Sequence, residues 1–370
     1  MRAWLLPVLL LLVLLSSACA PLPQVITPLP APRVTIVTSA PPTLTPSPTA
    51  THSTTEWIFP YTIQGLRQHD YQSGDIRVGE QIAETESYTA YLIEYSSDSL
   101  TITGVMQVPK TGKAPYPVIV MNHGFFSRSV YQSGDGTDRA AAFLNRYGYL
   151  TLSSDYRSWG RSDIGPSLFY SGLVIDVINL LNAIPSLAQA DAERIGMWGH
   201  SMGGGVTLKV LAVDSVLHPG RIHAAVLYST VSADDADIIA RWGSGCIGDI
   251  AAGERLYGCN SSDILPLDLP RGLIQAYQDA ATDPAVLRQV AALHFLDDVT
   301  APVQINYGTA DGESYSGTPP EWSKKVYQGF VEAGKQAELF AYQDEGHSFL
   351  ADQWYAFMER SAHFFDKYVK

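Results

Sequence analysis

Residues Arg194-Ile195-Gly196-Met197-Trp198-Gly199-His200-Ser201-Met202-Gly203 decide the fold of this chain. The apolar run that ends at Trp198 predicts a buried strand, and the residues after Ser201 predict a helix through about residue 213. The pattern Gly-x-Ser-x-Gly between a strand and a helix is typical of a strained turn that exposes the serine hydroxyl. The two glycines leave room where strand and helix nearly touch. We therefore expect Ser201 to be a nucleophile.

Outward from this turn, short apolar strands alternate with helices. The strands are predicted at 90–95, 100–108, 117–121, 149–153, 194–198, 224–229, 302–308 and 337–342, and the first two form a hairpin. The helices are predicted near 137–147, 172–184, 202–213, 321–333 and 353–368. This alternation indicates an α/β fold, with a mostly parallel central sheet and helices on both faces. Residues 232–296 break the rhythm and are expected to form an inserted helical cap.

The nucleophile needs a base, and the base needs an acid that orients it. His347 follows the last predicted strand, in Asp344-Glu345-Gly346-His347, and is the expected base. Asp311 follows strand 302–308 and is the expected acid, which gives the chain order serine, acid, histidine. His363 lies in a predicted helix, and the side chain of His200 should point elsewhere. The rival acids are Glu313, Asp297, Asp298 and Asp344.

A serine nucleophile also needs donors for the oxyanion that forms during its attack. One should be the backbone N–H of Met202, directly after the nucleophile. The other should come from the loop after an early strand, where Asn122-His123-Gly124-Phe125 follows the run 117–121. We nominate the N–H of Phe125.

The N-terminal segment has the layout of an export signal. Arg2 precedes an apolar run from Trp4 to Leu15, and the run is too short to span a bilayer. Cleavage after Ala18 would leave Cys19 at the new N-terminus, in a segment that resembles a bacterial lipobox; cleavage after Ala20 is the alternative. We expect residues 1–20 to be the signal and Cys19 to carry acyl chains that hold the protein to a membrane surface.

A segment rich in proline and threonine follows the signal. Residues 21–55 contain nine prolines among threonine, serine, alanine and valine. Such a segment cannot bury enough surface to fold, and its prolines keep it extended. We expect a disordered tether before a folded catalytic domain over 56–370, with the protein exported to the bacterial cell surface, lipid-anchored or secreted.

Composition excludes several function classes. The net charge of −13 argues against binding nucleic acid, whose phosphates attract lysine and arginine. The sequence has neither clustered metal-ligand spacing nor a phosphate-binding glycine motif, so we expect no metal and no cofactor. Cys246 and Cys259 both lie in the insert and could pair outside the cytoplasm; two free thiols are the alternative.

Five motifs together resemble the α/β-hydrolase superfamily, and within it the catalytic domain of the prolyl oligopeptidase family and related esterases. The motifs are Asn122-His123-Gly124-Phe125, the run 155–162, Gly199-His200-Ser201-Met202-Gly203-Gly204, Gly308-Thr309-Ala310-Asp311 and Gly346-His347-Ser348-Phe349. The resemblance implies a triad of Ser201, His347 and Asp311, no cofactor, and a small ester or peptide substrate.

The chain departs from the prolyl oligopeptidases at two points. It has no room for their propeller domain before the first hairpin, and Asn122 stands where they carry an oxyanion-hole tyrosine. These departures argue against proline-specific endopeptidase activity and leave esterase or small-peptide hydrolase activity open. A surface binding protein that has lost catalysis is the alternative function. In the run 155–162, we expect Asp155 and Arg157 to pair and pack the loop; a loop that lines the pocket is the alternative.

Overall fold

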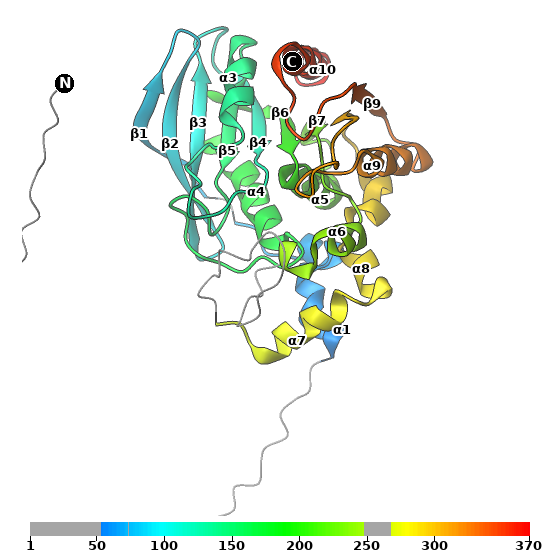
Figure 1. Cartoon of the computed structure of the whole chain (residues 1–370). Helices are drawn as coiled ribbons and strands as arrows, with labels where there is room; N and C mark the ends of the chain where they lie inside the picture. Colours follow the sequence, from blue (N-terminus) through cyan, green and yellow to red (C-terminus); the bar gives the residue numbers. More distant parts are fainter. Residues whose placement is uncertain (1–52, 73, 248–267) are drawn as a thin grey trace, which may run out of the picture. The chain divides into compact units, whose positions relative to one another are not determined.

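The computed structural model describes residues 53–72, 74–247 and 268–370. The predicted signal, the tether up to residue 52, Cys19 and Cys259 lie outside these residues, so the predicted disulfide does too. At the centre of the described part stands a nine-stranded sheet with the order β1-β2-β3-β5-β4-β6-β7-β8-β9 (Figure 1). Its strands are β1 (Arg77–Glu84), β2 (Tyr88–Ser97), β3 (Leu100–Pro109), β4 (Tyr116–Asn122), β5 (Leu150–Ser154), β6 (Ala190–His200), β7 (Ile222–Tyr228), β8 (Val303–Gly308) and β9 (Ala337–Tyr342).

The pairing of the strands changes once across the sheet, from antiparallel to parallel. β1, β2, β3 and β5 pair antiparallel, whereas β5, β4, β6, β7, β8 and β9 pair parallel. Parallel neighbours need crossover connections, and the helices between these strands supply them. The predicted α/β-hydrolase fold, with a mostly parallel central sheet, is confirmed.

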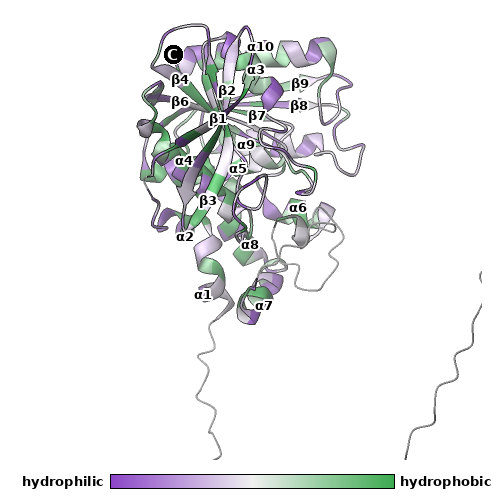
Figure 2. Cartoon of the chain, turned by 90° about the vertical axis from the view of Figure 1, so that its left-hand side faces the viewer, coloured by the Kyte–Doolittle hydropathy of each residue, from purple (hydrophilic) through white to green (hydrophobic). Residues whose placement is uncertain are grey.

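The side chains of β4 show how the sheet is buried on both faces. Val118 and Val120 join one apolar cluster, while Ile119 and Met121 join the other, because successive strand residues point to opposite faces. All four side chains are fully buried, and burying each such side chain contributes about 1.5–3 kcal/mol. Figure 2 shows hydrophobic positions gathered in the strands that converge at the centre of the view.

Helices cover both faces. The first cluster includes residues of α4 (Ser171–Ala183), α5 (Met202–Leu217) and α9 (Pro320–Glu332). The second cluster includes residues of α3 (Asp138–Arg146) and α10 (Ala351–Tyr368). Figure 1 shows α3 beside α10 and α4 beside α5. The helix expectations are confirmed for each of these segments, within a few residues at their ends.

Parallel strands bring distant loops to one edge. β6, β7, β8 and β9 run in the same direction, so the loops that follow them leave from the same edge of the sheet. Ser201 follows β6, Asp311 lies three residues after β8, and His347 lies five residues after β9. The topology alone therefore gathers these three residues.

The segment before the first hairpin contains structure that the sequence does not predict. Ser53 caps α1 (Thr54–Ile58): its hydroxyl accepts from the N–H of Glu56, whose carboxylate accepts from the N–H of Ser53. The predicted tether therefore extends too far at its end, since residues 53–55 belong to this turn. After η1 (Phe59–Tyr61), α2 (Ile63–Arg67) ends at Arg67, whose guanidinium donates to the carbonyl of Ala212.

The insert between β7 and β8 is helical where it is described. It comprises α6 (Asp235–Trp242), η3 (Ser244–Cys246), α7 (Arg271–Ala280), α8 (Pro284–Val290) and η4 (Ala292–Asp298). Both views show α7 beside α1, and a Cβ on Gly272 would come within 3.0 Å of the Trp57 ring (Figures 1 and 2). Within residues 53–72, 74–247 and 268–370, no helix has the length and apolar character to cross a bilayer.

Candidate active site

Ser201 occupies a strained position between β6 and α5. Its φ of 55° and ψ of −121° are rare for a residue with a side chain, and such strain costs about 1–3 kcal/mol. The start of α5 lies so close to the end of β4 that a Cβ on Gly203 would lie 2.0 Å from the carbonyl oxygen of Asn122. A Cβ on Gly199 would lie 2.4 Å from the carbonyl oxygen of Gly203. The two glycines of the motif are therefore a steric requirement.

The structure brings Ser201, His347 and Asp311 together. His347 Nε2 lies 2.9 Å from Ser201 Oγ, and His347 Nδ1 lies 3.1 Å from each carboxylate oxygen of Asp311. With a proton on Nδ1 and none on Nε2, the imidazole donates to the carboxylate and accepts from the serine hydroxyl. This is the arrangement in which a histidine can take the proton of a serine.

Asp311 is buried and held by more than the histidine. Thr318 donates to it twice, from its N–H to Oδ1 at 2.8 Å and from its hydroxyl to Oδ2 at 2.7 Å. Burial would raise the pKa of Asp311, but the hydrogen bond and charge of His347 and the Thr318 hydroxyl bring that pKa below 3.8. The carboxylate is therefore ionised at neutral pH and can stabilise an imidazolium.

The loop after β4 lies against the nucleophile. A Cβ on Gly124 would lie 3.1 Å from Ser201 Cβ, which brings the backbone of the next residue, Phe125, close to the serine. The N–H of Met202 is the first of α5 and has no partner within the helix. Among the described residues, neither this N–H nor that of Phe125 donates a backbone hydrogen bond.

The side chain of Asn122 is turned away from the serine. Its amide donates to Thr207 Oγ1 at 2.8 Å, and the residue is fully buried. Asn122 therefore ties β4 to α5 beneath the turn. The side-chain oxyanion donor of the prolyl oligopeptidases has no counterpart at this position.

Two residues that sequence reasoning left aside take part in the site. His200 does point away from Ser201, but its Nε2 lies 3.0 Å from the carbonyl oxygen of His347. Thr318 holds Asp311 as described, and no motif marks it. Of the rival acids, Asp298 pairs with Arg67, and Asp344 accepts from the side chain of Gln343.

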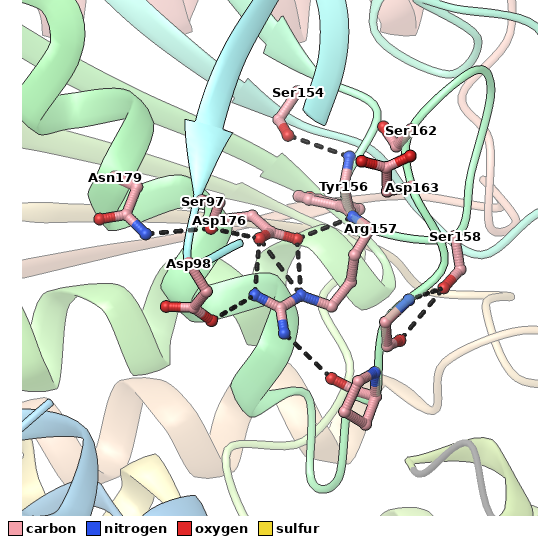
Figure 3. Close-up of polar contacts among 12 residues, drawn as sticks. Ser97, Asp98, Ser154, Tyr156, Arg157, Ser158, Ser162, Asp163, Asp176 and Asn179 are labelled. Atoms are coloured by element: carbon pink, nitrogen blue, oxygen red, sulfur yellow. Dashed lines mark hydrogen bonds and ion pairs between the residues drawn. The ribbon is translucent and has the colours of Figure 1, made fainter. Parts of the chain in front are cut away.

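A buried ion pair holds the loop after β5 (Figure 3). The sequence predicts a pair between Asp155 and Arg157, and this prediction is wrong. Arg157 Nη2 lies 2.8 Å from Asp176 Oδ1, on α4, and Nε lies 3.1 Å from Oδ2. Tyr156, between the two predicted partners, has a φ of 60°, which turns their side chains apart. Asp155 instead accepts from the hydroxyls of Thr103, Tyr131 and Ser133.

This loop supports the segment that carries Phe125. Trp159 Nε1 donates to the carbonyl of Phe126 at 3.0 Å, and the Trp159 ring meets the Phe125 ring edge-on at 6.4 Å. The run 155–162 is thus a packing element beside the proposed oxyanion loop. In the parts of the chain that the structure describes, no group of three or more histidine, cysteine or acidic residues is arranged to hold a metal ion.

Comparison with known proteins agrees with the fold. A family model of the alpha/beta hydrolase fold matches residues 117–245. The chain is 33% identical to the lysophosphatidylserine lipase ABHD12 of Xenopus tropicalis over 96 residues. These residues cover 26% of this chain and 23% of that protein. The chain spans less than half the length of the curated relatives it matches.

Solved structures share the architecture over most of the chain. An acetyl xylan esterase from Paenibacillus sp. R4 has a TM-score of 0.58 at 19% identity, covering 87% of this chain and 96% of the esterase. The acylaminoacyl peptidase of Pyrococcus horikoshii has a TM-score of 0.54 at 18% identity, covering 77% of this chain and 42% of the peptidase. These likenesses show the fold. Together with the strand order and the strand–turn–helix serine, they show that the chain has the α/β-hydrolase fold.

Proposed function

We propose that this chain is a serine hydrolase that cleaves carboxylic ester or amide bonds through an acyl-enzyme on Ser201. One observation carries the proposal: the 2.9 Å contact between Ser201 Oγ and His347 Nε2, on an imidazole whose other nitrogen faces a buried carboxylate. A serine hydroxyl is a weak nucleophile until such a base accepts its proton.

The proposed reaction has two halves. Ser201 Oγ attacks the substrate carbonyl carbon while its proton passes to His347 Nε2, and Asp311 stabilises the imidazolium. The imidazolium then gives its proton to the leaving alcohol or amine as the scissile bond breaks. Water, activated by the same imidazole, attacks the acyl-enzyme, and the acid product leaves with Ser201 restored.

The oxyanion of each tetrahedral intermediate needs donors that are already in position. The N–H groups of Met202 and Phe125 are proposed for this role, since both belong to backbone beside Ser201 and make no backbone hydrogen bond within the described residues. Neither depends on a side chain, so the proposal is compatible with the inward turn of Asn122.

A fluorophosphonate probe tests the nucleophile. We expect it to label the wild-type chain and not Ser201→Ala, because only an activated serine attacks phosphorus at a useful rate. Ser99→Ala, in the exposed turn of the β2–β3 hairpin, is the matched control and should be labelled fully. A folded wild-type chain that stays unlabelled, or labelling that survives Ser201→Ala, would contradict the proposal.

The substrate class is separated by kinetics. Comparing kcat/KM for p-nitrophenyl acyl esters and aminoacyl-p-nitroanilides on the same preparation distinguishes an esterase from a small-peptide hydrolase. An esterase should favour the esters by orders of magnitude. Comparable values for the two series would instead indicate amide hydrolysis as a native activity, with the same acyl-enzyme in both cases.

We also propose that the chain is exported and anchored to a bacterial membrane surface through lipid on Cys19. The support is the sequence layout alone: a short positive start, an apolar run and small residues up to a cysteine. Cells grown with labelled palmitate should incorporate it into the wild-type chain and not into Cys19→Ser. Equal incorporation in both, or none in either, would contradict the anchor.

A further inference from the structure

The acid Asp311 lies at the base of a closed loop that ends at Thr318. The two ends of the loop pack so closely that neither glycine has room for a side chain. A Cβ on Gly317 would lie 2.5 Å from Asp311 Oδ1, and a Cβ on Gly312 would lie 2.7 Å from Pro319 Cα. Because Thr318 donates to both carboxylate oxygens, the path of this loop sets the position of the acid.

The tip of the same loop is held by the insert. Arg241 Nη2, on α6, donates to the carbonyl of Gly312 at 3.1 Å and to that of Ser314 at 2.8 Å. Trp242 Nε1 donates to the carbonyl of Tyr315 at 2.7 Å, and Tyr315 Oη donates back to the carbonyl of Arg241 at 3.0 Å. Tyr315 is 64% exposed, so hydrogen bonds rather than apolar burial fix the tip.

Helix α6 is itself anchored to the framework of the site. Asp235, in its first turn, forms a buried ion pair of 2.9 Å with Lys209, on the helix that begins directly after Ser201. At its other end, the ring of Trp242 meets that of Trp322 edge-on at 5.1 Å. The helix therefore links the nucleophile helix to the loop of the acid.

We propose that Arg241 and Trp242 are positioning residues for Asp311, because α6 of the insert holds the loop that places the acid. The proposal rests on the proposed function, because it gives Asp311 the role of orienting His347. Arg241 and Trp242 contact neither Ser201 nor His347 in any hydrogen bond found among the described residues; they act through the loop backbone.

The physical consequence is specific. If the loop tip is released, Asp311 shifts, the Nδ1–H of His347 loses part of its acceptor, and the imidazolium loses part of its stabilising charge. The turnover step then slows while substrate binding is unaffected, and the pH profile of kcat changes. A role in fold stability alone would lower the yield of active protein without changing that profile.

The experiment uses the full chain with Arg241→Met, Trp242→Phe and the control Lys325→Met. Trp242→Phe keeps a ring against Trp322 but removes the donor. Lys325 pairs with Asp234 and Asp237 at the start of α6, 2.7 and 2.9 Å away, so the control removes an attachment of α6 without touching the loop tip. The readouts are kcat, KM and the pH profile with p-nitrophenyl acetate, and thermal unfolding of each variant.

We expect kcat to fall about tenfold in Arg241→Met and somewhat less in Trp242→Phe, with KM nearly unchanged and the pH profile of kcat altered. Lys325→Met should keep the wild-type kcat and pH profile. Arg241→Lys, which can reach one carbonyl, should recover part of kcat. An unchanged kcat and pH profile in both Arg241→Met and Trp242→Phe would overturn the proposal, as would an equal effect of Lys325→Met.

A substrate-free readout separates this proposal from the proposed function. The Nδ1–H proton of His347, assigned by its loss in Asp311→Asn, should give a downfield NMR resonance that moves upfield or broadens in Arg241→Met and Trp242→Phe. If the wild type shows this resonance but no fluorophosphonate labelling, the proposed function is contradicted. The change of the resonance in the two variants then still tests the positioning role. If the resonance is identical in wild type and both variants, the positioning role fails alone. If Arg241→Met does not fold, the same measurements on Trp242→Phe and Tyr315→Phe test the positioning role.

Discussion

His200 Nε2 donates to the backbone carbonyl of His347, with 3.0 Å between the two atoms, although 147 residue positions separate the two histidines. The two imidazole rings lie 4.8 Å apart, and the ring of His200 also stacks on Tyr228 at 4.4 Å. The variable residue of the Gly-x-Ser-x-Gly motif thus fixes the loop that carries the base.

The first prediction concerns this contact. His200→Phe keeps an aromatic ring but removes the donor, so the His347 loop should loosen and kcat should fall about tenfold, with little change in KM. His200→Gln, which retains an N–H donor, should keep more of the activity. Steady-state kinetics with one ester on the three proteins checks this; equal kcat values in all three would refute it.

The second prediction is a dependence of stability on pH. Burial and the neighbouring charge of His347 lower the pKa of His200 to about 3, whereas an unfolded histidine titrates near 6.5. Between these values the unfolded chain binds a proton that the folded chain does not, so this group's contribution to stability falls as the pH drops from 6.5 toward 3. Urea unfolding at pH 7.5 and 5.0 should show a larger loss for the wild type than for His200→Phe. Parallel losses would contradict the assignment.

The third prediction concerns Thr318. Thr318→Val keeps the backbone donor to Asp311 Oδ1 but removes the hydroxyl donor to Oδ2. We expect kcat to fall about tenfold, and stability to fall by about 1–3 kcal/mol because a buried carboxylate oxygen loses a partner. Thr318→Ser restores the hydroxyl and serves as the control. Kinetics and urea unfolding of both variants check the prediction, and wild-type kcat in Thr318→Val would argue against it.

The fourth prediction compares two arginine–carboxylate pairs. Arg157 and Asp176 are buried, with side-chain exposures of 5% and 0%, whereas Arg77 and Glu94 are 80% and 45% exposed. Arg157→Met leaves an unpaired buried charge and should destabilise the fold by about 3–5 kcal/mol. Arg77→Met should cost about 0–1 kcal/mol. Denaturant unfolding measures both; similar losses in the two variants would contradict this account.

The fifth prediction tests the serine turn. Gly203→Ala would put a Cβ 2.0 Å from the carbonyl oxygen of Asn122, where backbone faces backbone and neither can move aside cheaply. We expect a destabilisation of about 3 kcal/mol or more, with loss of activity. The control is Gly74→Ala, whose Cβ would meet its nearest atom at 3.8 Å, and which should leave unfolding and activity unchanged. A stable, active Gly203→Ala would show that the turn tolerates a wider spacing.

The sequence predicted the central strands well because each carries its own signal. The run 117–121 is continuously apolar, as a strand buried on both faces must be, and it lies within β4. β1 escaped prediction because nearly all of its residues are exposed and show no alternation. α1 and α2 are five residues each, too short for a helical period to register.

The residues of the site also fall into those that the sequence predicted and those that it did not. Ser201, Asp311 and His347 each follow a recognisable strand, so chain order was enough to nominate them and the structure brings their side chains together. Thr318 and Arg241 follow no strand and carry no motif. Their relation to Asp311 exists only once the acid loop has closed on itself and α6 lies against its tip.

The sequence by itself determined the strands from β2 to β9, where the strained turn lies, and which serine, acid and histidine could work together. These depend on local pattern: apolar periodicity, glycine at a close approach, and the order of residues along the chain. Only the tertiary structure decided that Arg157 pairs with Asp176 instead of Asp155, that His200 holds the base loop, and that the insert holds the acid loop. Such contacts join residues far apart in the chain, and their partners are set by which loops the parallel sheet brings to one edge.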